Sequence, residues 1–144
     1  MKQLRVITII LHFVVGVFGL MGGFAAISSP NGPFGISTDV LKNGPFSNFL
    51  IPGLTLFIVI GIGHIITGII VIKRNKYFPY VQGIMAAITV GWIIIQCWVM
   101  QDINALHIVI FIIGSVQGIH AGLELIKNKM FPVNIIMKKI GNTN

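Results

Sequence analysis

Charged side chains are scarce in this chain of 144 residues. Only 9% of its positions are Asp, Glu, Lys or Arg, whereas 55% are hydrophobic. A soluble domain carries about 25% charged residues, so this composition leaves too few charges to cover a soluble core. Four apolar runs are each about 20 residues long, which is the length that crosses a bilayer as a helix. The composition therefore excludes a soluble globular domain and predicts an integral membrane protein.

Acidic residues and cysteine are almost absent. Asp39, Asp102 and Glu124 are the only carboxylates, and they lie at different edges of the apolar runs, which argues against paired-carboxylate chemistry. The single Cys97 excludes an intramolecular disulfide. The chain also lacks a Walker-type loop, a dinucleotide fingerprint and a serine with a base and a carboxylate at its own depth. No catalytic residue is assigned, and the sequence favours a protein that is not an enzyme.

Basic residues are distributed unevenly about the apolar runs. Nine of the ten fall on one face of a four-span topology: Lys2, Arg5, Lys73, Arg74, Lys76, Lys127, Lys129, Lys138 and Lys139. Only Lys42 falls on the other face. The positive-inside rule then predicts a multi-pass protein of the cell (plasma) membrane with both termini in the cytoplasm. Anionic lipid headgroups suffice as partners for the basic face, so no nucleic acid is expected.

The predicted fold is all-α: one integral membrane domain, residues 1–144, built as a polytopic four-helix transmembrane bundle with N-in and C-in topology. The helices are expected at about 6–27, 50–72, 80–100 and 105–126, followed by an interfacial tail at 127–144. The first run is longer than the apolar region of a signal peptide, about 7–15 residues, so we interpret it as a retained helix. Short connections predict that the last three helices pack as antiparallel neighbours.

A 22-residue outer loop, residues 28–49, is expected between the first two helices. It contains Asn-Gly-Pro-Phe twice, at 31–34 and 43–46, and these are turn-forming sequences. We interpret the loop as two turns at the membrane interface with a short helix near 38–41. The alternative is an outer lid or a partner-docking loop.

Two segments that follow inward-running helices resemble each other. Residues 74–79 read RNKYFP and residues 127–132 read KNKMFP. This sequence similarity predicts two parallel helical hairpins related by an axis along the membrane normal.

Polar and small residues recur on one face of every expected helix. At about 100° per residue these faces form stripes, which must meet in the bundle interior because an unpaired polar group in hydrocarbon costs several kcal/mol. Three histidines fall at nearly one level, roughly 9–12 Å inside the inner boundary. The candidate polar interior site consists of His12, His64, His120, Gln117, Glu124, Thr67, Thr89 and Gln82. His107, near the outer end, is interpreted as an interfacial residue beside Asp102.

Glycines form two small-residue stripes that let a neighbouring backbone approach closely. The predicted packing residues are Gly16, Gly19 and Gly23 in the first helix and Gly114, Gly118 and Gly122 in the last. The second stripe is a candidate face for self-association, so a homo-oligomer is among the expected assemblies.

Three interpretations of the histidine cluster stay open. The polar residues can be structural hydrogen-bonding groups between helices, or they can relay protons or line a substrate path. As a third possibility, His12, His64 and His120 can bind a transition metal or haem. The simplest expectation is no cofactor, with haem or a transition metal as the alternative.

Three functions follow from these interpretations. The first is proton-linked transport or ligand passage through a histidine-lined site in the cytoplasmic half. The second is a non-catalytic accessory or immunity protein, whose outer loop binds an unidentified membrane partner. The third is a haem- or metal-binding membrane protein.

Residues 45–54 read PFSNFLIPGL. This stretch resembles a Pro-Phe-x-x-Phe-Leu-Ile-Pro-Gly-Leu segment of small, uncharacterised four-helix bacterial membrane proteins. The resemblance covers the start of one helix. It implies a four-helix membrane fold and assigns no activity, cofactor or site residue.

Overall fold

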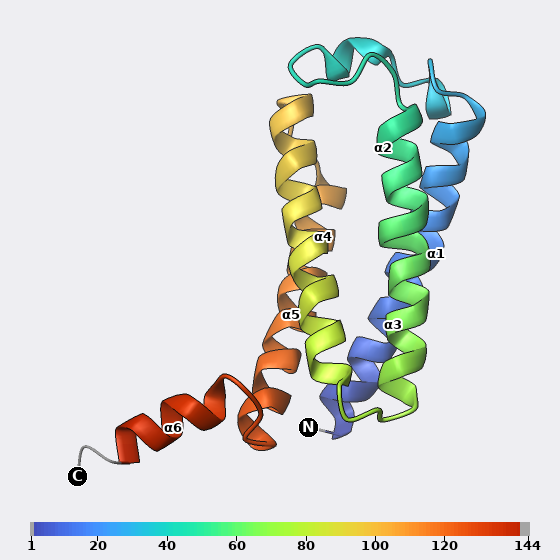
Figure 1. Cartoon of the computed structure of the whole chain (residues 1–144). Helices are drawn as coiled ribbons and strands as arrows, with labels where there is room; N and C mark the ends of the chain where they lie inside the picture. The colour runs from blue at the N-terminus through green and yellow to red at the C-terminus, as the bar shows by residue number, and fades with distance from the viewer. Residues whose placement is uncertain (1, 142–144) are drawn as a thin grey trace.

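The computed structural model describes residues 2–141 and is helical, with no strand in that range. Four rods stand side by side, and a short helix extends sideways from one end (Figure 1). The elements are α1 (Lys2–Ser28), the 3-10 turns η1 (Pro33–Gly35) and η2 (Thr38–Leu41), α2 (Leu50–Leu54), the π-helix η3 (Thr55–Ile62), α3 (Gly63–Ile72), α4 (Phe78–Met100), α5 (Ala105–Lys127) and α6 (Val133–Gly141).

Four helical spans are long and apolar enough to cross a membrane: Lys2–Ser28, Leu50–Ile72, Phe78–Met100 and Ala105–Lys127. The predicted all-α protein with four membrane-length helices is therefore confirmed. The second span joins α2, η3 and α3 into one rod. The largest difference from the expected bounds is at α1, which begins at Lys2 rather than near residue 6. The helix therefore includes the polar and basic residues that precede the apolar run, whereas the prediction was based on the apolar run alone.

The predicted interfacial tail divides into two parts. Lys127 completes α5, and α6 follows after a short connection. The sideways course of α6 is plain in Figure 1. It pairs exposed Ile135, Ile136 and Ile140 with basic Lys138 and Lys139, a composition typical of helices that lie on a membrane surface. Residues 142–144 of the predicted tail lie outside the described residues.

The spans form two antiparallel hairpins, one of α1 with the α2–η3–α3 rod and the other of α4 with α5. The rod and α5 end alike, each with a basic residue in the left-handed conformation just beyond the helix: Arg74 (φ 52°) and Lys129 (φ 48°). Helices commonly end in this way. The two hairpins agree with the similarity of residues 74–79 and 127–132, whereas their symmetry about the membrane normal stays a prediction.

Close backbone contact holds the first hairpin together. A Cβ at Gly19 would lie 2.9 Å from the Gly61 nitrogen, and one at Gly23 would lie 2.6 Å from the Phe57 nitrogen. Both partners belong to the π-helix η3. Gly19 and Gly23 therefore allow this close approach, because any side chain there would push the two helices apart.

The glycines of α5 face α4. A Cβ at Gly114 would lie 3.0 Å from Val90 Cγ2, and one at Gly118 would lie 3.6 Å from Ala86 Cβ, while a Cβ at Gly122 would meet nothing within 4 Å. The part of this stripe at Gly114 and Gly118, expected as a self-association face, is thus covered by α4 of the same chain.

The connection between the first two spans is residues 29–49, one residue shorter than predicted because Ser28 closes α1. The expected short helix is present as η2, where Ser37 Oγ accepts a hydrogen bond from the Asp39 backbone at 3.2 Å. Leu41 and Phe49 are buried with Val99 of α4. The loop therefore closes one end of the bundle.

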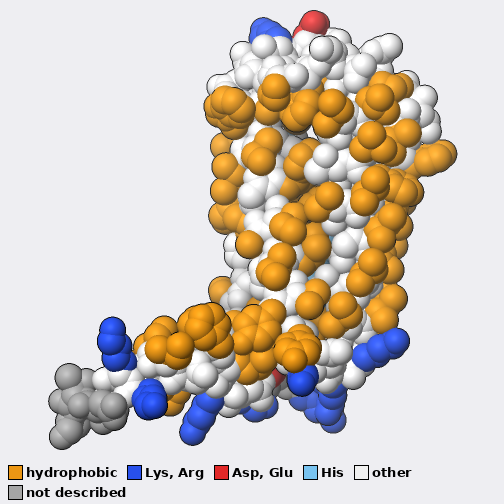
Figure 2. Space-filling model, viewed as in Figure 1, with side chains coloured by type: hydrophobic (Ala, Val, Ile, Leu, Met, Phe, Trp, Pro, Cys, Tyr) orange, Lys and Arg blue, Asp and Glu red, His pale blue; other side chains and the backbone are white. Residues whose placement is uncertain are grey.

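Basic side chains gather at the end that carries both termini, and apolar side chains cover the walls between the ends (Figure 2). We call this end the basic end. The opposite end, closed by residues 29–49, is called the loop end. Asp39 and Lys42 are exposed there.

Replacing Gly23 by Ala should destabilise the protein, because the added Cβ would overlap the η3 backbone. Overpacking of this kind costs about 1–3 kcal/mol. Gly91→Ala in α4 is the matched control, since a Cβ there would meet nothing within 4 Å and Ala is the better helix former. Thermal unfolding in detergent should give a lower Tm for Gly23→Ala than for Gly91→Ala. Equal Tm values would contradict the close contact of α1 with η3.

Candidate functional site

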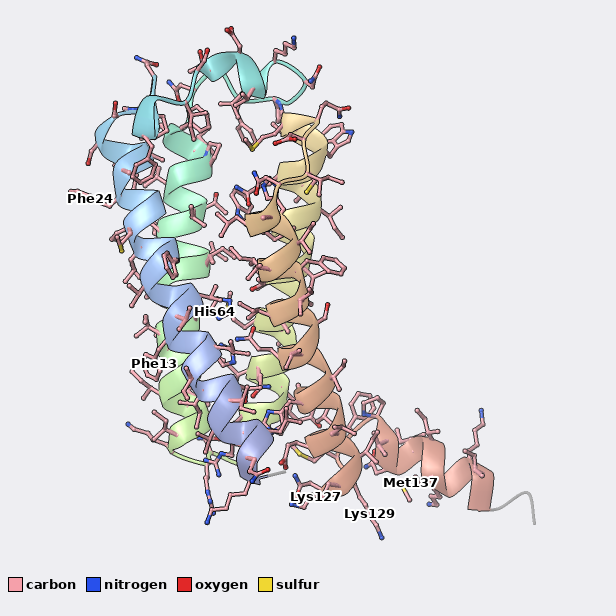
Figure 3. All side chains as sticks on the ribbon, turned by 180° about the vertical axis from the view of Figure 1, so that it is seen from behind. Phe13, Phe24, His64, Lys127, Lys129 and Met137 are labelled. Atoms are coloured by element: carbon pink, nitrogen blue, oxygen red, sulfur yellow. The ribbon has the colours of Figure 1, made fainter. Side chains whose placement is uncertain are left out.

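The interior between the hairpins is polar in the half nearer the basic end. All eight predicted site residues are buried there: His12, His64, His120, Gln82, Gln117, Thr89, Thr67 and Glu124. His64 points between the helices, whereas Phe24 projects from the outer surface (Figure 3). The periodicity of the sequence thus identified which faces turn inward.

The first hydrogen-bonded group joins three helices. His12 Nδ1 of α1 lies 2.8 Å from His64 Nδ1 of α3, and His64 Nε2 lies 2.7 Å from Thr89 Oγ1 of α4. The Thr89 hydroxyl is also 2.9 Å from the Met85 carbonyl and donates to it. The one hydroxyl hydrogen is thereby used, so Thr89 accepts from His64 Nε2–H. His64 Nδ1 then accepts from His12 Nδ1–H, and His12 Nε2 is left as a bare acceptor.

The second group surrounds His120. Gln82 Nε2 donates to the Gln117 carbonyl at 2.8 Å and lies 2.9 Å from His120 Nδ1. An amide nitrogen only donates, so His120 Nδ1 accepts. The ring is then neutral and carries its hydrogen on Nε2, 3.7 Å from Glu124 Oε1. This separation is too long for a hydrogen bond.

Thr8 also belongs to this group, although it is not among the eight site residues predicted from the sequence. It is fully buried on α1, and its hydroxyl lies 3.0 Å from His120 Nδ1 and 3.0 Å from the Arg5 carbonyl. The signal was present in the sequence, because Thr8 falls one turn before His12 on the same polar stripe. Thr67 behaves differently from the other candidates: its hydroxyl donates to the Gly63 carbonyl of its own helix at 2.8 Å.

The three histidines therefore divide into a pair and a single residue. His12 and His64 are in contact, with ring centroids 5.0 Å apart, while His120 Nδ1 accepts from Gln82 and lies beside the Thr8 hydroxyl. His120 contacts Thr8, one helical turn before His12 on α1. At a rise of 1.5 Å per residue, the level of His120 is therefore about 6 Å nearer the basic end than that of His12.

Several buried polar atoms have no hydrogen-bond partner within the described chain: His12 Nε2, His120 Nε2, Gln82 Oε1, Trp92 Nε1 and both side-chain atoms Nε2 and Oε1 of Gln117. Leaving such a group unpaired costs about 1–3 kcal/mol. Buried polar groups are normally bonded to protein or to ordered water. This interior is therefore chemically suited to water or to a small polar ligand.

The same geometry does not suit a three-histidine metal site or a haem. Among residues 2–141, no three His, Cys, Asp or Glu side chains are grouped so that they could hold a metal ion. Two imidazole nitrogens on one tetrahedral zinc are about 3.3 Å apart, given bonds of about 2.0 Å. His12 and His64 instead share a direct hydrogen bond of 2.8 Å, which an iron between them would have to displace.

An apolar layer lies beyond Thr89 towards the loop end. Val15 and Ile60 are buried there, and Leu56, Trp92 and Ile113 pack against them. His107, at the loop end, belongs to neither polar group: it completes the N-terminal cap of α5 with Asn104. The polar interior thus extends from the basic end to about the middle of the bundle.

No family model matches the chain, and no curated protein or solved structure matches it. The helices and the interior nevertheless define a class. The chain is a helical protein of membrane-spanning type, with a hydrogen-bonded polar interior between two hairpins.

Replacing Thr89 by Val should destabilise the protein by about 1–3 kcal/mol, because His64 Nε2–H would lose its buried acceptor. Thr67→Val is the matched control. Both threonines are buried and both donate to the carbonyl four residues earlier, but only Thr89 bonds another helix. A lower Tm for Thr89→Val than for Thr67→Val is expected, and the reverse order would contradict the assigned bond.

Proposed function

We propose that this chain is a multi-pass protein of the plasma membrane with both termini in the cytoplasm. The distribution of charge supports this orientation. Both ends of the described chain lie at the basic end, and Lys42 is the one basic residue at the other. Cytoplasmic segments are enriched in Lys and Arg.

We further propose that the protein carries out proton-linked passage of a small polar ligand through its histidine-lined interior. The observation that carries the proposal is the chain of contacts from His12 to His64 to Thr89, which joins α1, α3 and α4 at full burial. Ionisable groups inside a membrane are costly and commonly mark ion or substrate paths.

The assigned hydrogens permit one proton to move from the cytoplasmic side to His64 in the middle of the bundle. His12 Nε2 takes up a proton from the cytoplasmic side, through water held by the side-chain amides of Gln82 and Gln117. His12 then gives the hydrogen of Nδ1 to His64 Nδ1, and His12 is neutral again. The positive charge now lies on His64, which still donates through Nε2 to Thr89.

The apolar layer then acts as the gate. A charge on His64 next to Val15 and Ile60 is poorly solvated, so separation of the hairpins and entry of water become more favourable once the proton arrives. The proton and the ligand pass together because each needs the same opening.

Proton flux into proteoliposomes should test this function. A pH-sensitive dye inside the vesicles should report flux above that of protein-free vesicles when a membrane potential is applied. The triple variant His12→Ala, His64→Ala and His120→Ala should lower the flux by more than about tenfold, because it removes both proton carriers, His12 and His64. His107→Ala, outside the polar interior, should keep it. Equal flux in the wild type and in a folded triple variant would contradict the proposal.

A second candidate is supported by the loop end. Phe34 is 77% exposed and has φ 53°, while Leu41 and Phe49 hold the same loop on the bundle. An ordered loop that presents an exposed aromatic residue suits an accessory protein that docks a membrane partner.

Crosslinking in native membranes distinguishes this candidate. The variant Asp39→Asn, Lys42→Gln should abolish a crosslinked partner species if the loop binds it, because both exposed charges are lost. The triple histidine variant should leave that species unchanged. If the crosslinked partner species is still formed by the Asp39→Asn, Lys42→Gln variant, the accessory role is contradicted.

A further inference from the structure

A cavity of about 510 Å³ opens at the basic end, between the start of α1, the connection from α3 to α4 and the end of α5. Five cationic side chains line it: Lys2, Arg5, Arg74, Lys76 and Lys127. Glu124 is the one carboxylate in the wall, so the lining carries five positive charges against one negative charge.

Among residues 2–141, Glu124 is the one carboxylate that lies beside these five cations. The other two carboxylates, Asp39 and Asp102, lie at and beyond the opposite ends of helices. None of the five forms an ion pair with Glu124, whose carboxylate faces His120 and Asn128 instead. Cations gathered around one cavity repel each other, and an anion in the cavity would relieve that repulsion.

Arg5 is the most organised of the five. One of its terminal nitrogens donates to the carbonyls of Val71 and Ile72 at the end of α3, and the guanidinium lies 5.7 Å from the centre of the Phe78 ring. Its Nε is buried and has no hydrogen-bond partner in the described chain. The guanidinium is thus fixed in place with a donor still to be used.

The lone carboxylate is already engaged. Glu124 Oε2 accepts from Asn128 Nδ2 at 3.2 Å, and Oε1 faces His120 at 3.7 Å. The cationic walls are exposed apart from Arg5, which is half-buried. The cavity therefore offers several free donors to a ligand and one partly occupied acceptor.

From this arrangement we propose that the cavity binds a phosphate group, either in the headgroup of an anionic lipid or in a free phosphate. The cations that line the cavity come from three segments of the chain, and guanidinium and ammonium groups suit the several oxygens of a phosphate. The site lies at the end of the membrane spans, which is the level of lipid headgroups. This inference goes beyond the proposed function, since it requires neither the histidines nor any flux.

Binding should be measured on the full chain in a non-ionic detergent, by native mass spectrometry and by Tm. The probes are inorganic phosphate, short-chain phosphatidylglycerol and short-chain phosphatidylcholine. Phosphatidylglycerol that binds and raises Tm, with no effect of inorganic phosphate, assigns the site to a headgroup. Inorganic phosphate that binds and displaces phosphatidylglycerol assigns it to a free phosphate. Binding of neither, or equal binding of phosphatidylcholine, overturns the proposal.

Two variants locate the site. Arg74→Gln, Lys127→Gln should weaken binding by at least about tenfold, because two charge-assisted contacts are lost. Lys129→Gln, Lys138→Gln removes the same charge from the same end but outside the cavity, and should change binding little. Equal weakening by the two double variants would show a diffuse charge effect and overturn the site.

Glu124→Gln gives a result of opposite sign. It removes the only carboxylate of the wall, so phosphate binding should become several-fold tighter. A variant that binds phosphate no better than the wild type would contradict the cavity as the binding place. Phosphate binding is measured directly and not through proton flux. Its failure can therefore be told apart from a failure of the proposed proton passage.

Discussion

The hydrogen bond between His12 and His64 joins the two helices of the first hairpin, and the bond from His64 to Thr89 joins that hairpin to the second. Inside a bilayer, apolar side chains do not prefer one another over lipid, so van der Waals packing and hydrogen bonds decide how helices associate. Close glycine contacts set the distance between α1 and η3. The imidazoles then set which faces meet, because another rotation would break the His12–His64 and His64–Thr89 hydrogen bonds.

Sequence periodicity predicted an all-helical chain with four membrane-length helices. Four apolar runs became four spans, and every polar residue assigned to the inward stripes is buried. The pairing of those residues was not predictable in the same way. Which imidazole meets which partner depends on the axial offset between helices: His120 lies beside Thr8, one turn before His12 on α1, while His12 lies beside His64. The π-helix η3 was also missed, because its hydrogen bonds leave no mark in a pattern of period 3.6.

Glu124 belongs to two environments. Its carboxylate faces His120 of the polar interior and also forms part of the wall of the basic cavity. It is the only acidic residue at this end of the chain. A phosphate bound in the cavity would therefore lie near the one carboxylate that also faces the polar interior.

The asymmetric depth of the polar interior has an electrical consequence. A proton held on His12 has crossed between about a third and a half of the hydrocarbon, given the rise of α1 and a core of about 30 Å. Moving one charge across a whole membrane changes its energy by about 2.3 kcal/mol per 100 mV. Occupancy of His12 would then respond to voltage by about 1 kcal/mol per 100 mV. A protein with the proposed proton uptake at His12 would thus respond to the membrane potential as well as to the proton concentration.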